Sequence, residues 1–269
     1  MYKQWGPRQS EKVARVFSAT NRRLKEMQGS YREMSAMMIN EDTNVKPQMF
    51  QYTRRSGDKV FRIKNLSKQY TGGNNEIINA LDLKGLEINI SFGDRLYVYG
   101  SNGAGKSTLL RLLARSIASD HDFLPTEGVI EAGSSIDLGY FSPDLVEVRA
   151  DSTVLRYVSE VMGVPNEQRI RTVLMYWGIP YEQQNATVGT LSKGERTQLE
   201  LAKLMIRDPN LLVLDEPTMN LSQKLVSRLL DSLKDYKGTI ILVSHDRRFV
   251  PSLKLNKRLN IEEKKLVIL

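Results

Sequence analysis

Residues 100–108, which read GSNGAGKST, constrain this chain more than any other stretch. The apolar sequence RLYVY precedes them and TLLRLLARSI continues from Thr108, so the pattern predicts a strand, a glycine-rich loop and a helix. The spacing of Gly100, Gly105, Lys106 and Ser107 matches a P-loop, whose backbone N–H groups and helix N-terminus cradle phosphate. The residues predicted to contact a nucleotide are therefore Gly100, Ser101, Asn102, Gly103, Ala104, Gly105, Lys106, Ser107 and Thr108.

The sequence LLVLDEP supplies the acids that such a loop needs. Its four apolar residues predict a buried strand that brings Asp215 to the carboxyl end, where Mg²⁺ is expected. Ser107 is the second predicted magnesium ligand, because its hydroxyl opens the helix after the loop. Lys106 is expected to neutralise phosphate charge, and Glu216 follows at the position suited to polarising an attacking water.

A second phosphate cradle is predicted from LSKGERTQLELAKLM, which starts at Leu191. A Ser-x-Gly turn before a helix again presents oriented N–H groups and a hydroxyl to an anion. Two cradles in one domain imply that two chains share each nucleotide. The residues predicted to contact the nucleotide of the opposing chain are Ser192, Lys193, Gly194 and Glu195.

Together with His245 in ILVSHD, these motifs resemble the ATP-binding cassette family over about residues 59–269. The resemblance implies an α/β P-loop NTPase cassette with a helical subdomain, and ATP and Mg²⁺ as ligands. It implies ATP hydrolysis when the chain is paired with a second cassette. By the same resemblance, Tyr70 stacks on adenine, His245 contacts the γ-phosphate, and Glu216, His245 and Lys106 are catalytic.

The signature GERTQLELAKLM resembles the ABC-F branch, translation factors and ribosome-protection factors of antibiotic resistance in which a long helical linker joins two cassettes. Residues 1–58 fit the second strand of that linker, since apolar side chains between Val13 and Met38 recur in steps of three, four and seven. The resemblance implies an α-helical linker arm (1–58) and a second cassette (59–269). It also implies ribosome or rRNA as partner.

Charge is concentrated in the arm. Residues 1–60 contain 12 Lys/Arg and 6 Asp/Glu, which is +6 of the formal +8 of the chain. This excess fits either a polyanionic partner such as nucleic acid or a solvated linker helix. The chain has no Cys, hence no disulfide partner, and only His121 and His245, which argues against an imidazole zinc site. The absence of an apolar run of about 18 residues predicts no integral membrane segment and a cytoplasmic location.

The periodicity of the body predicts strands at 60–66, 85–90, 94–100, 128–133, 136–141, 211–215 and 239–246, and a closing hairpin over 257–269. It predicts helices at 152–162, 165–177, from about 194, and near 222–234. Because helices alternate with strands in the last third of the chain, we expect a largely parallel sheet covered on both faces.

Three positions depart from the cassette pattern. Pro143 stands where the family usually has a Gln near the magnesium, so either Asp144 substitutes for the Gln or the position is vacant. Residues 219–222 read MNLS where Asn-His-Leu-Asp is usual, and Lys193 replaces a glycine. These departures predict ATP binding with slow hydrolysis. Pro143 and residues 219–222 also keep open the alternative of a nucleotide-gated binding module, and a membrane-transporter subunit is a further alternative to the ABC-F interpretation.

Overall fold

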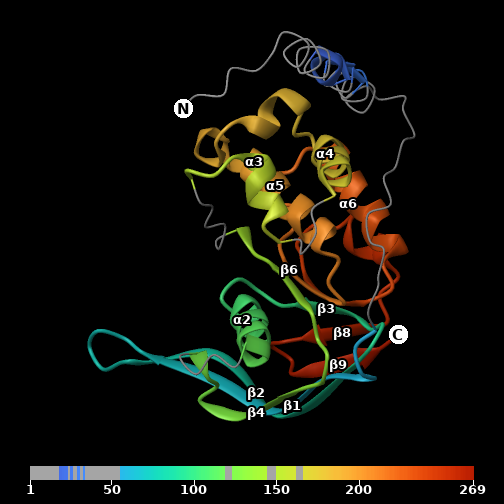
Figure 1. Ribbon diagram of the computed structural model, residues 1–269. Coiled ribbons are helices and arrows are strands. Elements are labelled where there is room, and N and C mark those ends of the chain that lie inside the picture. Colours follow the sequence, from blue (N-terminus) through green and yellow to red (C-terminus); the bar gives the residue numbers. More distant parts are fainter. Residues whose placement is uncertain are drawn as a thin grey trace, which may run out of the picture.

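The protein is described by a computed structural model that covers residues 18–23, 25–26, 29–30, 33, 55–118, 123–143, 150–161 and 166–269. Within these residues, two sheets and two groups of helices form the cassette (Figure 1). The predicted cassette region, 59–269, begins at the first strand.

The central sheet has six strands in the order β5-β6-β7-β3-β8-β9. They are β3 (Arg95–Tyr99), β5 (Leu138–Phe141), β6 (Leu211–Asp215), β7 (Thr239–Val243), β8 (Lys257–Asn260) and β9 (Lys265–Ile268). The first five strands of this order are parallel, and β9 pairs antiparallel with β8 as the predicted closing hairpin. The expectation of a largely parallel sheet is confirmed for this layer.

Both faces of the central sheet are buried, which explains why β6 and β7 are apolar at almost every position. Because alternate side chains of a strand point to opposite faces, Leu211 and Val213 of β6 pack into one core and Leu212 and Leu214 into the other. A continuous apolar run therefore marks a strand between two layers.

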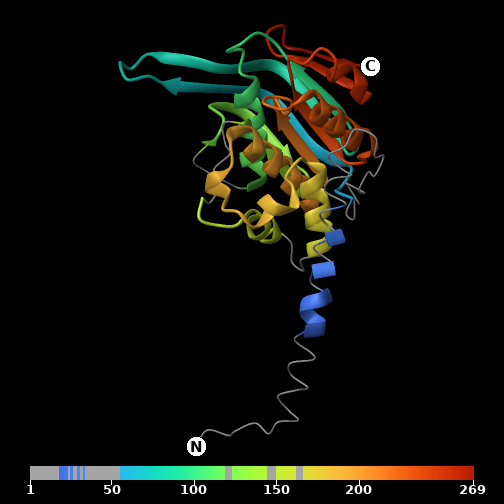
Figure 2. The ribbon, with the colours of Figure 1, turned by 90° about the horizontal axis from the view of Figure 1, so that it is seen from above.

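A second sheet, which the sequence did not predict as a separate layer, covers one face. It is antiparallel, in the order β2-β1-β4, with β1 (Lys59–Thr71), β2 (Ile77–Ser91) and β4 (Glu127–Ala132). The short turn at 72–76 forces β1 and β2 into a hairpin. This hairpin projects beyond the rest of the molecule (Figure 2). The strand predicted at 85–90 is thus only the second half of β2.

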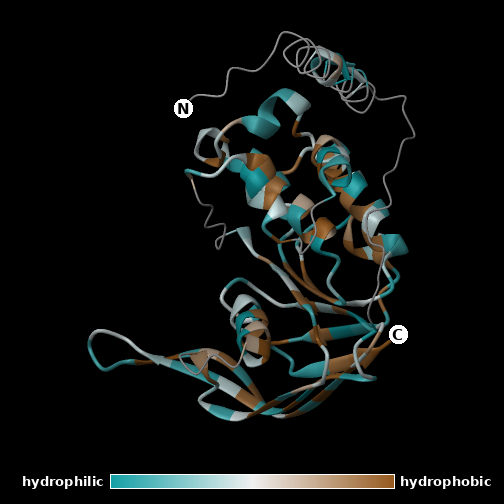
Figure 3. Ribbon diagram, viewed as in Figure 1, coloured by the Kyte–Doolittle hydropathy of each residue, from teal (hydrophilic) through white to brown (hydrophobic). Residues whose placement is uncertain are grey.

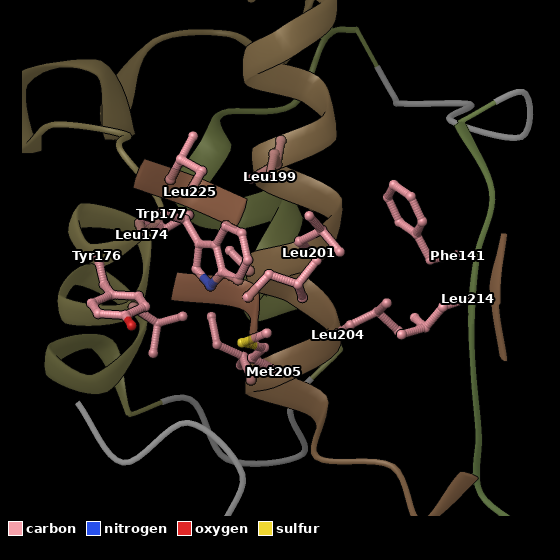
Figure 4. Close-up of a cluster of buried hydrophobic side chains, with 14 of the residues drawn as sticks. Phe141, Leu174, Tyr176, Trp177, Leu199, Leu201, Leu204, Met205, Leu214 and Leu225 are labelled. Carbon is pink, nitrogen blue, oxygen red and sulfur yellow. The ribbon is translucent and has the colours of Figure 1, made fainter. Parts of the chain in front are cut away.

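Helix α2 (Lys106–Ala118) lies between the two sheets, and its buried leucines share a core with both (Figures 1 and 3). The other face carries α3 (Val154–Ser159), α4 (Glu167–Tyr176), α5 (Lys193–Arg207) and α6 (Gln223–Asp235). Helices α3 and α4 are shorter than predicted. Their core is centred on Trp177, which is fully buried among residues of α4, α5 and α6 (Figure 4). This layer is the predicted helical subdomain.

The arm is described only at residues 18–23, 25–26, 29–30 and 33, and all of these are helical. The apolar positions of its predicted stripe, including Val13, Leu24 and Met38, lie outside the described residues. These described positions are helical, whereas the arm as a whole and its seam for a partner helix stay predictions.

Candidate nucleotide-binding site

The predicted motifs meet at one edge of the central sheet because they follow neighbouring parallel strands. Strands β6, β7 and β3 lie side by side, with Asp215 opposite Val243 and Val98 opposite Val243. The P-loop after β3, the acids ending β6 and His245 after β7 therefore share the carboxyl edge, where open α/β sheets bind ligands. Sequence spacing could not show this proximity, since it depends on strand order.

A cleft of about 540 Å³ opens at this edge. Its size is typical of small-molecule sites. It brings together most of the predicted site residues. Those that line it are Tyr70, Asn102, Gly103, Gly105, Lys106, Ser107, Thr108, Asp215, Glu216 and His245.

Backbone conformation shapes the P-loop. Gly105 has a φ of +98°, and a Cβ there would lie 2.3 Å from the carbonyl oxygen of Ala80 in β2. Only glycine fits this close approach between loop and strand. The loop then enters α2, whose first turn contains no acidic residue and includes Lys106 and Ser107. The helix N-terminus is thus free to face an anion.

Lys106 is buried at the base of the loop, and its ammonium donates hydrogen bonds to the carbonyls of Gly100 and Ser101, at 2.9 and 2.7 Å. The lysine thus closes the loop on itself. A phosphate bound in the cradle would be an additional partner for the same ammonium, which has three donors.

Glu216 and His245 form a pair at the edge of the cleft. The Glu216 Oε2 accepts a hydrogen bond from the backbone N–H of His245 at 3.1 Å, and its Oε1 lies 3.5 Å from the His245 Nε2. Glu216 has a φ of +47°, a left-handed conformation that is unusual outside glycine. This strained backbone places a carboxylate in the cleft, and such strain is common at functional sites.

The residues suit a magnesium that is held partly by phosphate. Asp215 is buried at the end of β6, and Ser107 lines the same cleft from α2. The described residues include no group of three or more His, Cys, Asp or Glu that could hold a metal alone. Mg²⁺ usually takes one or two protein carboxylates and completes its shell with phosphate and water, so the two predicted ligands fit it.

Tyr70, near the end of β1, also lines the cleft. The residue is 39% exposed, and the centroid of its ring lies 5.4 Å from the Lys68 ammonium and 6.4 Å from the centroid of the Phe123 ring. The ring thus has neighbours within the chain, while the residue also lines the cleft. Stacking on a base stays a prediction.

The signature residues Ser192–Glu195 are not among the described residues that line this cleft. They begin α5 with a capping box, in which the Ser192 hydroxyl accepts from the Glu195 N–H and the Glu195 carboxylate accepts from the Ser192 N–H. Hydrogen bonds from Ser192 lower the pKa of Glu195. The two predicted phosphate cradles of one chain therefore do not form a single site.

The departures from the cassette pattern have partly structural roles. Ser222 caps α6, with its hydroxyl accepting from the Leu225 N–H at 3.4 Å. Asn220 has a φ of +63°, and its carbonyl lies 3.5 Å from the position of a Cβ on Gly194. The segment 219–222 thus lies against the signature. Pro143 follows β5, while Asp144 lies outside the described residues.

One residue near the P-loop was missed. The Glu262 carboxylate, between β8 and β9, accepts hydrogen bonds from the backbone N–H and the hydroxyl of Ser101. No motif covers this position. Only the pairing of β8 with β3 could have revealed it.

Comparisons with known proteins agree with this geometry. A family model described as "ABC transporter" matches residues 83–219, just over half of the chain. The chain belongs to the ATP-binding cassette family. It is 34% identical over 202 residues to the ATP-binding protein Uup of Haemophilus influenzae, covering 73% of this chain and 29% of Uup. It is also 34% identical to the probable ATP-binding protein YheS of the same organism, covering 62% of this chain and 26% of YheS.

These relatives confirm the resemblance to the ABC-F branch, and the chain spans less than a third of either. The fold also matches a solved dimeric structure of the bacterial ABC transporter cassette MJ0796, with a TM-score of 0.59 and 22% identity over 75% of this chain and 94% of that one. The predicted cassette fold is thereby confirmed. ATP and Mg²⁺ are the ligands of this ATPase family. No helix among the described residues is long and apolar enough to cross a bilayer.

Proposed function

We propose that this cassette hydrolyses ATP in composite sites, each built from the P-loop cleft of one cassette and the signature of another. The observation that carries the proposal is the separation of the signature from the cleft in a single chain. Glu216 and His245 would then act on the terminal phosphate only when a facing signature completes its environment, since preorganised donors from both sides stabilise transition-state charge.

Mixing two defective variants tests this pairing. Lys106→Ala disables the P-loop, and Gly194→Asp places a negative charge at the signature. The space at Gly194 admits a Cβ in ordinary contact. Each variant alone is expected to be inactive. An equimolar mixture should recover about a quarter of the wild-type ATPase rate, because half of the pairs contain one intact site. If mixing recovers no activity, two copies of this chain do not form the sites.

We further propose that the protein acts on the ribosome in the cytoplasm, in translation or in antibiotic resistance by ribosome protection. The similarity to ABC-F proteins and the basic charge of residues 1–60 support this. The described arm residues are helical, as a linker would be. ATP-driven closure of paired cassettes would move the arm relative to ribosomal RNA, with binding energy selecting the closed state.

Cosedimentation with ribosomes checks this second proposal. The Glu216→Gln variant should pellet with ribosomes in ATP and much less in ADP, at a salt concentration near physiological. Binding that ignores the nucleotide and falls steeply with salt would instead indicate charge attraction alone. Recovery of the chain with membrane subunits would favour the transporter alternative.

A hydrolysis-impaired, nucleotide-gated module remains a second candidate, which Pro143 and the sequence of residues 219–222 favour. It predicts ATP-dependent ribosome binding with no measurable turnover, even in the presence of a partner cassette. The ATPase rate of the wild-type chain distinguishes it from the first.

A further inference from the structure

The P-loop already holds a negatively charged group from its own chain. Strand β8 is parallel to β3, with Asn260 opposite Tyr99, so the turn after β8 emerges beside the loop after β3. The Ile261 N–H continues the pairing by donating to the Tyr99 carbonyl at 3.1 Å. Glu262 follows directly and turns its carboxylate toward the first residues of the P-loop.

This placement is fixed by the turn. The Asn260 side-chain oxygen accepts hydrogen bonds from the backbone N–H groups of Glu262 and Glu263, at 3.0 and 3.2 Å. Such a side-chain to backbone contact stabilises one turn geometry. The backbone of Gly100 passes close by, since a Cβ there would lie 3.6 Å from the Glu262 Oε2.

The carboxylate contacts groups that a P-loop offers to phosphate. Its Oε2 accepts from the Ser101 N–H at 3.1 Å and its Oε1 accepts from the Ser101 hydroxyl. These bonds, with a smaller effect of the nearby Lys106 charge, lower the pKa of Glu262, so the group is ionised at neutral pH. An N–H has one proton to donate, so a phosphate oxygen would compete for it.

Glu262 lines a second cavity that shares residues with the nucleotide cleft but does not include Tyr70. This cavity of about 340 Å³ is lined by Gly100, Lys106, His245 and Glu262. It shares with the main cleft Lys106 and His245, the residues predicted to contact the phosphates, whereas Tyr70 and Ile78 line the main cleft alone. The carboxylate therefore faces the region of the terminal phosphate rather than that of the base.

We propose that Glu262 is a specificity-determining residue of this cassette, which acts as an internal anion at the terminal-phosphate end of the P-loop and weakens triphosphate binding relative to diphosphate binding. ATP must displace the carboxylate from Ser101 or bind beside it. In the second case the negative charges of the carboxylate and the terminal phosphate repel each other. ADP lacks the phosphate that would meet it. The contact therefore lowers the ATP affinity of the cassette relative to its ADP affinity.

Titration of the full chain with ATP and with ADP, each with Mg²⁺, tests the proposal. The Glu262→Gln variant keeps the size of the side chain and removes its charge. Its ATP affinity should rise about fivefold, while its ADP affinity should change by less than about twofold, as expected for one partly screened charge. Glu263→Gln is the matched control, because Glu263 is the next residue in the same turn, and it should bind both nucleotides as the wild type does.

Glu262→Ala removes both the charge and the hydrogen bonds that the carboxylate accepts from Ser101. It should also bind ATP more tightly, and its thermal unfolding without nucleotide should remain cooperative. The proposal is overturned if Glu262→Gln binds ATP no better than the wild type, or gains equally for ADP. It is also overturned if both variants bind ATP more weakly, which would make Glu262 a support of the loop.

Discussion

Replacing Lys106 with alanine is expected to lower the ATP affinity of the chain by about 10- to 150-fold, since a hydrogen bond to a charged group contributes about 1.5–3 kcal/mol. Lys106 is the buried ammonium at the base of the cleft, and it lies where phosphate would enter. Isothermal titration with ATP and Mg²⁺ measures the effect.

The alanine also removes the bonds from Lys106 to the carbonyls of Gly100 and Ser101, so folding must be checked separately. Thermal unfolding of the variant without nucleotide provides that check. Lys265→Ala, which removes an exposed lysine of β9, is the matched control and should leave ATP affinity unchanged. A folded Lys106→Ala variant with wild-type affinity would show that the cleft is not the phosphate site.

Replacing Glu216 with glutamine is expected to lower the ATPase rate of paired cassettes by at least about 100-fold, within the usual contribution of a general base. Glutamine keeps the oxygen that accepts the His245 N–H, but it cannot take a proton from water. ATP affinity should therefore stay close to that of the wild type. Single-turnover hydrolysis together with equilibrium binding separates the two effects.

Glu263→Gln again serves as the control, since it neutralises an exposed carboxylate outside the described lining of the cleft. An unchanged residual rate in Glu216→Gln would rule out Glu216 as the base. If the wild-type rate is itself negligible with every partner cassette, the chain is a binding module, and the departures at 143 and 219–222 account for it.

The local chemistry of the site could be read from the sequence because it depends on short spacing. The P-loop from Gly100 to Thr108, the acids at 215 and 216 and the capping serine at 192 each lie on the predicted type of element. Gly105 illustrates why the pattern is strict, since its backbone touches β2 and leaves no space for a side chain.

The arrangement of distant segments could not be read in the same way. The sequence predicted strands at 60–66 and 85–90 without showing how they pair, and in the structure they belong to a hairpin that forms a separate antiparallel layer over α2. The first half of β2 was not predicted, because the exposed residues Ile77 and Ile78 do not alternate with polar ones. The buried side chains of β2 are those that pack against other elements in the core.

The sequence by itself determined that this chain binds nucleotide in a P-loop cassette of the ABC-F type, because each motif consists of neighbouring residues whose backbone geometry and chemistry are local. The tertiary structure alone decided which motifs meet. Strand order placed His245, Glu216 and the P-loop at one edge, left the signature outside that cleft, and brought Glu262 to Ser101. Pairing between strands distant in sequence depends on the whole packed core, which no short pattern encodes.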